Sequence, residues 1–348
     1  MRLRPVHFVD APFAYPGGTV ARLAGGLQWF AAYEVSGDGA RHIVPVAEIP
    51  QLGERAALLH ARCTSPRAPL ALGERVLRLD QPQVAAILNV TPDSFSDGGA
   101  HLDDPAAAAA AGMAMAGAGA ALIDVGGEST RPGAALVWEE DEARRVAPVV
   151  ERLARAGALV SVDTRKAPVM EAALAAGARI VNDVSALLWD ERALPLVVRS
   201  AAPVILMHSP DPKGGGHARV TYDDVVGEVF DWLEARVEAV VAAGVERARV
   251  IVDPGIGFGK SLSDNLALLN GLAMFHGLGC AVMLGASRKR LIGALSNEAP
   301  VEQRLGGSVA LALKGAEAGV QLLRVHDVAE TVQAVRVWRG LRDRALVG

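Results

Sequence analysis

From residue 84 to the C-terminus, short apolar runs alternate with longer segments of helical periodicity. The apolar runs are continuous rather than alternating in polarity, as in strands that are buried on both faces of a parallel sheet. Eight of these runs predict strands, at residues 84–90, 122–127, 159–163, 179–183, 203–208, 250–253, 281–285 and 322–326. The segments between them predict helices, such as residues 141–156, 167–176, 223–243, 308–319 and 329–341. This alternation is typical of an α/β protein built from repeated strand–helix units.

The number of units indicates a closed barrel. Eight strand–helix units between residues 84 and 348 match the length of a (β/α)8 TIM barrel, which is typically about 250 residues. A doubly wound open sheet is the alternative. Polar and glycine-rich residues follow nearly every predicted strand, and in a barrel all these positions meet at one mouth. We therefore expect an α/β fold with a (β/α)8 TIM barrel.

The first 83 residues lack this alternation. Their pattern predicts little beyond a helix near residues 53–61 and a loop at residues 64–69. We therefore expect an N-terminal extension of unknown role, residues 1–83, followed by a barrel domain, residues 84–348.

Composition and charge narrow the possible functions. The formal net charge of −4 and the lack of a Lys/Arg run argue against nucleic-acid binding. The uncharged stretch at residues 106–123 is rich in Ala and Gly and flanked by aspartates, so it predicts a helix leading into a buried strand rather than a membrane span. The N-terminus has no evident export signal. With two distant cysteines, Cys63 and Cys280, the chain has no disulfide framework or zinc site, and we expect a cytoplasmic enzyme for small molecules.

Three loops after predicted strands carry candidate chemistry. The loop at residues 89–99 is longer than the roughly 2–6 residues usual for such connections. The loop at residues 126–133 combines two glycines with Thr130 and Arg131, which suit a phosphate group. The loop at residues 253–261 resembles nucleotide-binding fingerprints, but both lack a required glycine. Each loop alone could also be an ordinary surface connection.

Three polar residues end predicted strands: Asp163, Asn182 and Asp253. A single such residue is more often a helix cap than a ligand-binding group. Together at one mouth, two carboxylates and an amide could accept and donate hydrogen bonds along the N–H edge of a heterocycle such as a pterin. Metal binding by the same carboxylates is the competing hypothesis.

Basic residues follow the last two predicted strands. Lys289 lies in a basic segment after the seventh strand, where many barrels bind phosphate. Arg324 and His326 are two positions apart on the eighth strand, so their side chains point to the same face. With Arg131 they could form a pocket for a polyanion. The alternatives are a solvated helix start and a structural histidine.

Taken together, these segments resemble the dihydropteroate synthase family. Residues 87–99 (ILNVTPDSFSDGG) resemble its first signature, and residues 124–133 (DVGGESTRPG) resemble its second. Segments at residues 162–164, 181–183, 253–260, 287–289 and 324–327 follow in the family's order. The resemblance runs from about residue 84 to the C-terminus. It departs from the family pattern after His208, and residues 1–83 have no counterpart in the minimal family barrel.

The resemblance implies an enzyme of folate biosynthesis. Such an enzyme condenses 6-hydroxymethyl-7,8-dihydropterin pyrophosphate with para-aminobenzoate to give 7,8-dihydropteroate and pyrophosphate. It also implies Mg²⁺ as the cofactor, a homodimer, and sulfonamides as inhibitors that resemble para-aminobenzoate.

The resemblance further implies a role for each matching residue. The pterin ring is assigned to Asp163, Asn182, Asp253 and Lys289. The metal and pyrophosphate are assigned to Asn89, and the leaving group or the arriving aminobenzoate to Thr130, Arg131, Arg324 and His326. The aminobenzoate pocket is assigned to Phe95, Pro132, Phe258 and Ser287. Catalysis is assigned to Asp97, Lys289 and Arg324, with Asp97 stabilising a pterin methylene cation.

The chemistry agrees with these residues, because pyrophosphate leaves readily once cations neutralise its charge and no protein nucleophile is needed. Two alternatives stay open. A pterin-binding methyltransferase would share the carboxylates but would have no use for an arginine-rich anion pocket. A catalytically silent pterin-binding module would retain the fold without turnover.

Overall fold

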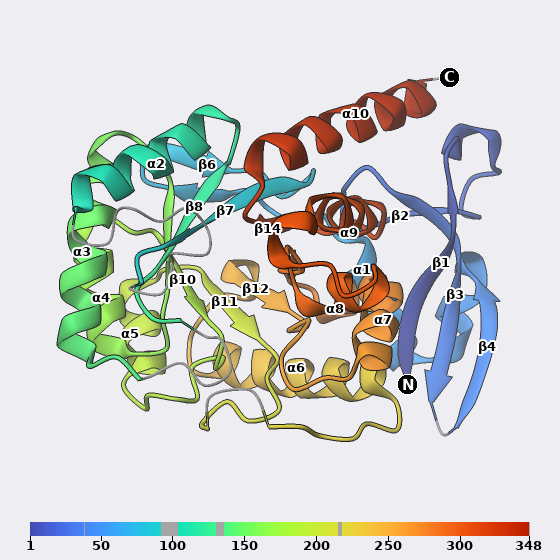
Figure 1. Ribbon diagram of the computed structural model, residues 1–348. Coiled ribbons are helices and arrows are strands. Elements are labelled where there is room, and N and C mark those ends of the chain that lie inside the picture. Colours follow the sequence, from blue (N-terminus) through green and yellow to red (C-terminus); the bar gives the residue numbers. More distant parts are fainter. Residues whose placement is uncertain (38, 92–103, 130–135, 215–217, 348) are drawn as a thin grey trace.

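The computed structural model describes residues 1–37, 39–91, 104–129, 136–214 and 218–347. In these ranges, eight parallel strands form a closed barrel in sequence order (Figure 1). They are β7 (Gln83–Asn89), β8 (Leu122–Gly126), β9 (Val160–Asp163), β10 (Ile180–Asp183), β11 (Val204–Met207), β12 (Val250–Asp253), β13 (Ala281–Leu284) and β14 (Leu322–Val325). The barrel closes where β14 pairs with β7. The barrel prediction is therefore confirmed, and the open-sheet alternative is wrong.

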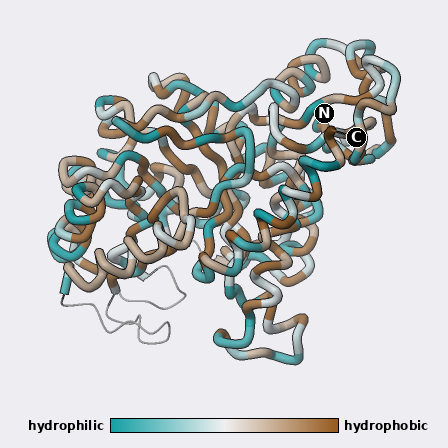
Figure 2. The backbone as a smooth tube through the Cα atoms, turned by 90° about the horizontal axis from the view of Figure 1, so that it is seen from above, coloured by the Kyte–Doolittle hydropathy of each residue, from teal (hydrophilic) through white to brown (hydrophobic). Residues whose placement is uncertain are grey.

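Helices surround the barrel, one or more after nearly every strand. They are α2 (Pro105–Gly117), α3 (Glu139–Arg155), α4 (Ala167–Ala176), α5 (Ala193–Ser200), α6 (Val225–Ala242), α7 (Leu262–Gly271), α8 (Arg290–Leu295), α9 (Leu305–Glu317) and α10 (Val328–Val347). The uncharged stretch forms α2 and the start of β8, as predicted. None of the helices in the described ranges combines the length and hydrophobicity needed to cross a bilayer. Hydrophobic positions gather in the central strands, whereas the helices mix both kinds (Figure 2).

The N-terminal extension is an antiparallel sheet with a helix, beside the barrel (Figure 1). Its strands are β1 (Arg2–Val9), β2 (Ala21–Arg22), β3 (Trp29–Gly37) and β4 (Ala40–Pro45), and they are followed by the 3-10 helix η2 (Val46–Leu52) and by α1 (Glu54–Thr64). The predicted helix near residues 53–61 is thus confirmed. The sequence pattern did not predict the sheet.

The extension packs closely on the barrel domain. β1 and α1 both contact the 3-10 helix η5 (Leu272–Leu278), which precedes β13. The buried guanidinium of Arg67 joins the two parts, because it donates to the carbonyls of Arg62 in α1 and of His276 and Cys280 in the barrel domain, each at 2.9 Å. A buried guanidinium that loses its acceptors is costly, so the contacts of Arg67 favour the extension and the barrel domain staying together.

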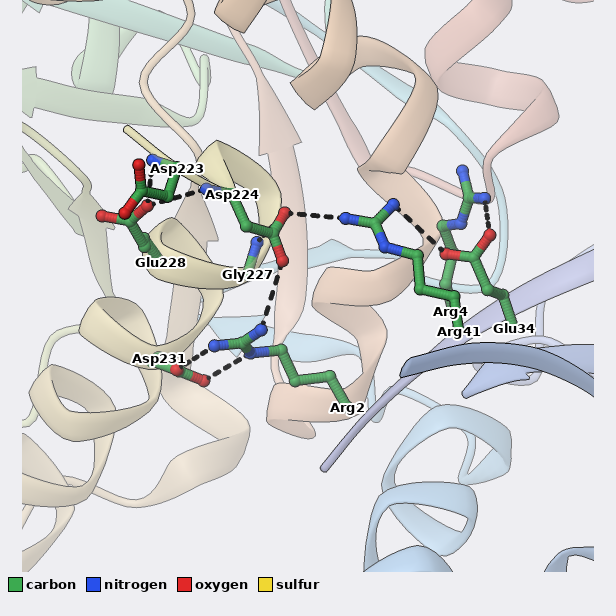
Figure 3. Close-up of polar contacts among 9 residues, drawn as sticks. All are labelled: Arg2, Arg4, Glu34, Arg41, Asp223, Asp224, Gly227, Glu228 and Asp231. Atoms are coloured by element: carbon green, nitrogen blue, oxygen red, sulfur yellow. Dashed lines mark hydrogen bonds and ion pairs between the residues drawn. The ribbon is translucent and has the colours of Figure 1, made fainter. Parts of the chain in front are cut away.

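Ion pairs add a second contact, between the sheet and α6 (Figure 3). Arg2 pairs with Asp231 and, at 3.3 Å, with Asp224. Arg41 reaches the other oxygen of Asp224 at 3.3 Å. Arg41 and Asp231 are largely exposed, so these pairs orient the sheet more than they stabilise it.

A hairpin closes the end of the barrel at which the strands begin. It consists of β5 (Leu70–Leu72) and β6 (Arg75–Leu77). Its leucines and Leu79 form one buried cluster with barrel residues near the start of the strands, including Leu122, Ile180, Ile205, Ile251 and Leu322. The hairpin thus contributes to the barrel core although it precedes residue 84. The division at residue 83 stays a prediction about which part folds independently.

Candidate active site

Polar side chains gather at the carboxyl ends of neighbouring strands. Asn182 pairs in register with Asp163, and Gly126 pairs with both Asp163 and Asn89. The side chains of Asn89 and Asp163 flank Gly126: a Cβ there would lie 3.7 Å from Asn89 Oδ1 and 3.5 Å from Asp163 Cβ. The structure therefore brings together three of the predicted residues at one mouth.

Arg324 lies at the centre of this cluster. Its Nε donates to Asp124 Oδ2 and its terminal nitrogen donates to Asp163 Oδ2, both at 2.6 Å. Asp124 also accepts hydrogen bonds from Asn182 Nδ2 at 3.0 Å and from Ser161 Oγ at 2.6 Å. Arg324 thus contacts two carboxylates of the cluster, whereas the sequence grouped it with the anion-binding cations.

Sequence reasoning did not select Asp124 as a site residue. It lies inside β8 with 2% of its surface exposed. A charged residue within a buried apolar strand was the available signal, since such a group must find partners inside the fold. Its partner Arg324 is 200 positions away in sequence, and only the closed barrel brings them together.

Burial and charge shift the pKa values of this cluster in opposite directions. Burial raises the pKa of Asp163, and Arg324 opposes this shift. Burial alone would lower the pKa of Arg324, but Asp124 and Asp163 outweigh it and raise the pKa, so that Arg324 stays protonated. Perturbed titratable groups in a barrel mouth are typical of a functional site.

Asp253 and Lys289 lie on the other side of Arg324. A Cβ on Gly285 would approach Asp253 Oδ2 within 3.5 Å and the Arg324 side chain within 3.9 Å. Burial raises the pKa of Asp253, and the charge of Lys289 opposes that shift. Burial lowers the pKa of Lys289 to about 8, although Asp253 opposes this. The cluster therefore extends from β8 to the loop after β13.

Lys289 also contacts Phe258, a residue predicted for the aminobenzoate pocket. Its ammonium lies 4.8 Å from the centre of the Phe258 ring and donates to the carbonyl of Ile256. The preceding residue, Arg288, has a left-handed φ of 56° and pairs with Asp327 at 2.5 Å. A non-glycine residue in this conformation is held by its surroundings and is common at binding sites.

Ser287 and His326 form a hydrogen-bonded pair. Ser287 Oγ lies 3.1 Å from His326 Nδ1 and accepts the His326 backbone N–H at 3.2 Å. These contacts orient the imidazole at the end of β14. The residues that follow the last two barrel strands are thus in contact.

Five predicted site residues lie outside the described residues: Phe95, Asp97, Thr130, Arg131 and Pro132. Their roles stay predictions. Described residues on either side of the second segment contact one another. Glu128 accepts the N–H of Val137 at 3.0 Å, and Lys166 Nζ donates to the Val137 carbonyl at 2.8 Å and pairs with Glu128 at 3.1 Å.

Asp183 and Gly127 lie next to site residues in sequence, but their contacts stabilise the fold. Asp183 accepts hydrogen bonds from Ser185 N, Ser185 Oγ and Leu187 N at 2.6–2.9 Å, so it caps a turn. A Cβ on Gly127 would lie 2.6 Å from Val146 and 2.8 Å from Glu142 in α3. This glycine allows helix packing, and Gly126 is the one that faces the site.

Asn89 is the one residue predicted to contact a metal. It is exposed at the end of β7 and offers a single amide oxygen. Among the side chains that the structure describes, no group of three or more His, Cys, Asp or Glu could hold a metal ion. Mg²⁺ usually keeps several waters and binds through one or two protein groups together with substrate phosphates. The amide oxygen of Asn89 therefore fits Mg²⁺ that arrives with a diphosphate.

Known proteins match most of the chain. The Pterin binding enzyme family matches residues 85–326. Dihydropteroate synthase from Escherichia coli (strain K12) is 46% identical over 262 residues, which are 75% of this chain and 92% of that protein. The structure of Xanthomonas albilineans dihydropteroate synthase with 4-aminobenzoic acid is 50% identical with a TM-score of 0.73, and covers 79% of this chain and 98% of its own. The structure of the Xanthomonas albilineans enzyme in complex with 7,8-dihydropteroate is 47% identical with a TM-score of 0.71, covering 79% and 99%.

Proposed function

The chain belongs to the dihydropteroate synthase family of pterin-binding enzymes, and we propose the roles of its residues in the reaction on that basis. The enzyme is a transferase. It condenses 6-hydroxymethyl-7,8-dihydropterin pyrophosphate with para-aminobenzoate to form 7,8-dihydropteroate and pyrophosphate. The observation that carries the residue assignment is the convergence of Asp163, Asn182, Asp253 and Lys289 around Arg324 at the barrel mouth.

The carboxylates suit the pterin ring. The amidine-like edge of a pterin presents adjacent N–H donors, and Asp163 and Asp253 present carboxylate acceptors from two different strands. Asn182 adds an amide that can donate and accept. Arg324 holds Asp163 in place, and Lys289 presents a cation beside Asp253. Partners that are already held in place reduce the loss of conformational entropy that opposes binding.

The condensation is a substitution at the pterin methylene carbon. The C–O bond to pyrophosphate breaks, and the electron pair leaves with pyrophosphate. The aniline nitrogen of para-aminobenzoate donates its lone pair to the methylene carbon to form the C–N bond, and then releases a proton to solvent. The ring delocalises the positive charge that develops before attack, and the buried carboxylates favour that charge. Asp97 is proposed to stabilise the same cation.

Cations are proposed to receive the departing pyrophosphate. Arg324 lies in β14 and His326 directly follows that strand. Thr130 and Arg131 are proposed to complete this pocket. Mg²⁺ would be held by Asn89 together with the phosphate oxygens, and when bound it supplies positive charge that neutralises the leaving group. Phe95, Pro132, Phe258 and Ser287 are proposed to contact para-aminobenzoate.

One assay tests the function. We expect pyrophosphate release that requires both substrates and Mg²⁺, with 7,8-dihydropteroate formed in equal amount. Asp163→Asn should bind a dihydropterin at least about 10-fold more weakly by calorimetry, because the amide replaces an acceptor with a donor. Asp343→Asn, a change at an exposed carboxylate on α10, is the control. Substrate binding without pyrophosphate release would instead favour a catalytically silent pterin-binding module.

We further propose that the protein is a cytoplasmic homodimer. Large apolar side chains are exposed on the adjacent helices α9 and α10, among them Leu305, Val337 and Leu341. An apolar helix pair of this kind suits a symmetric interface. Cys63 and Cys280 are buried and unpaired in the described chain, which suits a reducing compartment. Sedimentation velocity tests the dimer: a monomer at micromolar concentration would contradict it.

A further inference from the structure

A lysine that the reaction does not use lies beside the site. The loop after β12 runs from Pro254 to Ser261 and contains three glycines with left-handed backbone, at φ values of 70°, 84° and 61°. Lys260 Nζ folds back into this loop and donates to the carbonyls of Gly255 at 2.9 Å and of Phe258 at 3.2 Å. The side chain thus spans the loop that carries Phe258.

Lys289 binds a carbonyl that lies in sequence between these two contacts. Lys289 Nζ donates to the carbonyl of Ile256 and lies over the Phe258 ring. The backbone passes so close to Lys289 that a Cβ on Gly257 would lie 3.0 Å from its Cδ. Two ammonium groups therefore bind carbonyls of the same loop. Lys260 binds those of Gly255 and Phe258, and Lys289 binds that of Ile256.

The rest of the loop is anchored independently. Asn265 Oδ1 accepts the N–H of Gly257 at 2.6 Å, and its amide nitrogen donates to the carbonyls of Lys260 and Ser261 at 3.2 and 2.7 Å. Ser261 and Asp264 form a capping box at the start of α7. The backbone of Lys260 is thus fixed by a rigid helix start, and its side chain transmits that rigidity to the other end of the loop.

We propose that Lys260 is a positioning residue, whose ammonium group holds the loop after β12 in the conformation that places the Ile256 carbonyl and the Phe258 ring against Lys289. Lys260 itself does not need to touch either substrate. The inference rests on the proposed function only in assigning Lys289 and Phe258 to the substrates. Its effect on the loop itself is independent of that function.

The environment of Lys260 makes this contact dependent on pH. The charged groups that act on Lys260 are Lys289, Asp253 and Asp264. The imidazole of His208 is also close enough for the charge of Lys260 to lower its pKa. Burial and then the charge of Lys289 lower the pKa of Lys260 to about 7, while the two aspartates oppose this shift. Burial also lowers the pKa of His208 to about 3, so the imidazole is neutral above that value. As pH rises through 7, the ammonium loses its charge and its hydrogen bonds weaken.

Hydrogen exchange measures the loop directly. At pH 6.5 we expect Lys260→Met to reduce the protection of the Phe258 amide, which donates to the Gly255 carbonyl at 3.2 Å, about 10-fold to 100-fold, the range for losing charge-assisted hydrogen bonds. Amides of β12 such as Val252 should keep their protection. Lys213→Met, the same change at an exposed position after β11, is the matched control. Loop protection equal to that of the wild type would overturn the proposal.

Kinetics and the conservative variant separate positioning from general destabilisation. We expect Lys260→Met to lower kcat/KM about 10-fold or more, without a matching loss in Lys213→Met. Lys260→Arg should restore loop protection and remove its decline above pH 7, because guanidinium stays protonated. If Lys260→Met does not fold, the wild type decides. Its loop protection, corrected for intrinsic exchange, should fall between pH 6 and 8, and a flat profile counts against the proposal. Loss of protection in a chain that forms no dihydropteroate would support the positioning role and reject the proposed function.

Discussion

At the scale of single residues, Arg324 connects the groups of the site. Its guanidinium pairs with Asp124 and Asp163 at 2.6 Å while 19% of the side chain is exposed. Asp124 itself is nearly inaccessible. A buried carboxylate depends on its partner, because removing the partner leaves an uncompensated charge in a poorly hydrated place. Arg324 therefore holds Asp163, the proposed pterin ligand, in addition to its proposed part in the anion pocket.

We predict that Arg324→Ala weakens both dihydropterin binding and folding stability. Its loss leaves Asp124 and Asp163 without their common cation, so the free energy of unfolding should fall by about 3 kcal/mol. Calorimetry with a dihydropterin and urea unfolding measure the two effects. Arg324→Lys is the comparison, since it keeps the charge but loses the two-pronged geometry. Unchanged dihydropterin affinity in Arg324→Ala would show that Asp163 is positioned without it.

A second prediction concerns His276 and acid. This side chain is fully buried, and its Nε2 lies 3.0 Å from the Ala318 carbonyl. Burial lowers its pKa to about 3, so between that value and the ordinary pKa near 6.5 the unfolded chain binds more protons than the folded one. Stability from this group is complete above pH 6.5 and is lost as pH falls toward 3.

Urea unfolding between pH 4 and 6.5 tests this sign. For each proton taken up on unfolding, the free energy of unfolding should fall by about 1.4 kcal/mol for each unit by which the pH is lowered. His276→Gln should reduce the slope by about one proton, and His208, whose pKa burial also lowers, should supply part of what is left. Equal slopes in the variant and the wild type would contradict the assignment.

At the scale of elements, buried ion pairs join the start of α3 to the loops around the site. Lys166 precedes α4 and pairs with Glu142 of α3 at 2.6 Å and with Glu128 at 3.1 Å. Glu142 has no exposed surface, and burial raises its pKa against the effect of Lys166. Arg165 pairs with Glu128 at 3.2 Å and stacks over the Trp189 ring at 3.8 Å. These contacts hold residues 128 and 137 together.

We predict that Lys166→Met lowers the free energy of unfolding by about 3 to 5 kcal/mol, because Glu142 loses its cation inside the fold. The double variant Lys166→Met with Glu142→Gln should recover part of this loss, since it removes both charges. A double-mutant cycle by urea unfolding gives the coupling between the two residues. Additive effects of the two single changes would mean that the pair contributes no coupling.

At the scale of the whole molecule, the N-terminal extension and the hairpin make different contributions. The sheet and α1 pack on the outside, against η5 and α6. The hairpin fills the end of the barrel at which the strands begin with Leu70, Leu72 and Leu77. The extension can therefore be removed in steps that separate these contributions.

We predict that a chain starting at residue 81 is insoluble, because it loses the hairpin and exposes the apolar core at the end of the barrel where the strands begin. A chain starting at residue 65 keeps the hairpin and Arg67. It should fold, melt at a lower temperature than the full chain, and still form dihydropteroate. Solubility, thermal unfolding and the pyrophosphate assay compare the two. Equal behaviour of both truncations would show that the hairpin does not support the barrel.

The sequence by itself determined the barrel and most of its mouth. The strands are buried on both faces, so each appears as a continuous apolar run whose ends differ from the observed ends by no more than one residue. Residues that end such runs, including Asp163, Asn182 and Asp253, must meet at one mouth once the strands are parallel. The order of the motifs then indicated the family.

Only the tertiary structure decided which distant residues meet. The N-terminal sheet pairs β1 with β3 across an irregular segment, and such pairing leaves no local periodic signal. Asp124 became a site residue through Arg324, and Lys260 became a positioning residue through carbonyls that a glycine-rich backbone turns toward it. Local sequence records how a segment is buried, because burial follows its own apolar pattern. The partner of a buried charge depends on the closure of the barrel, which is a property of the whole chain.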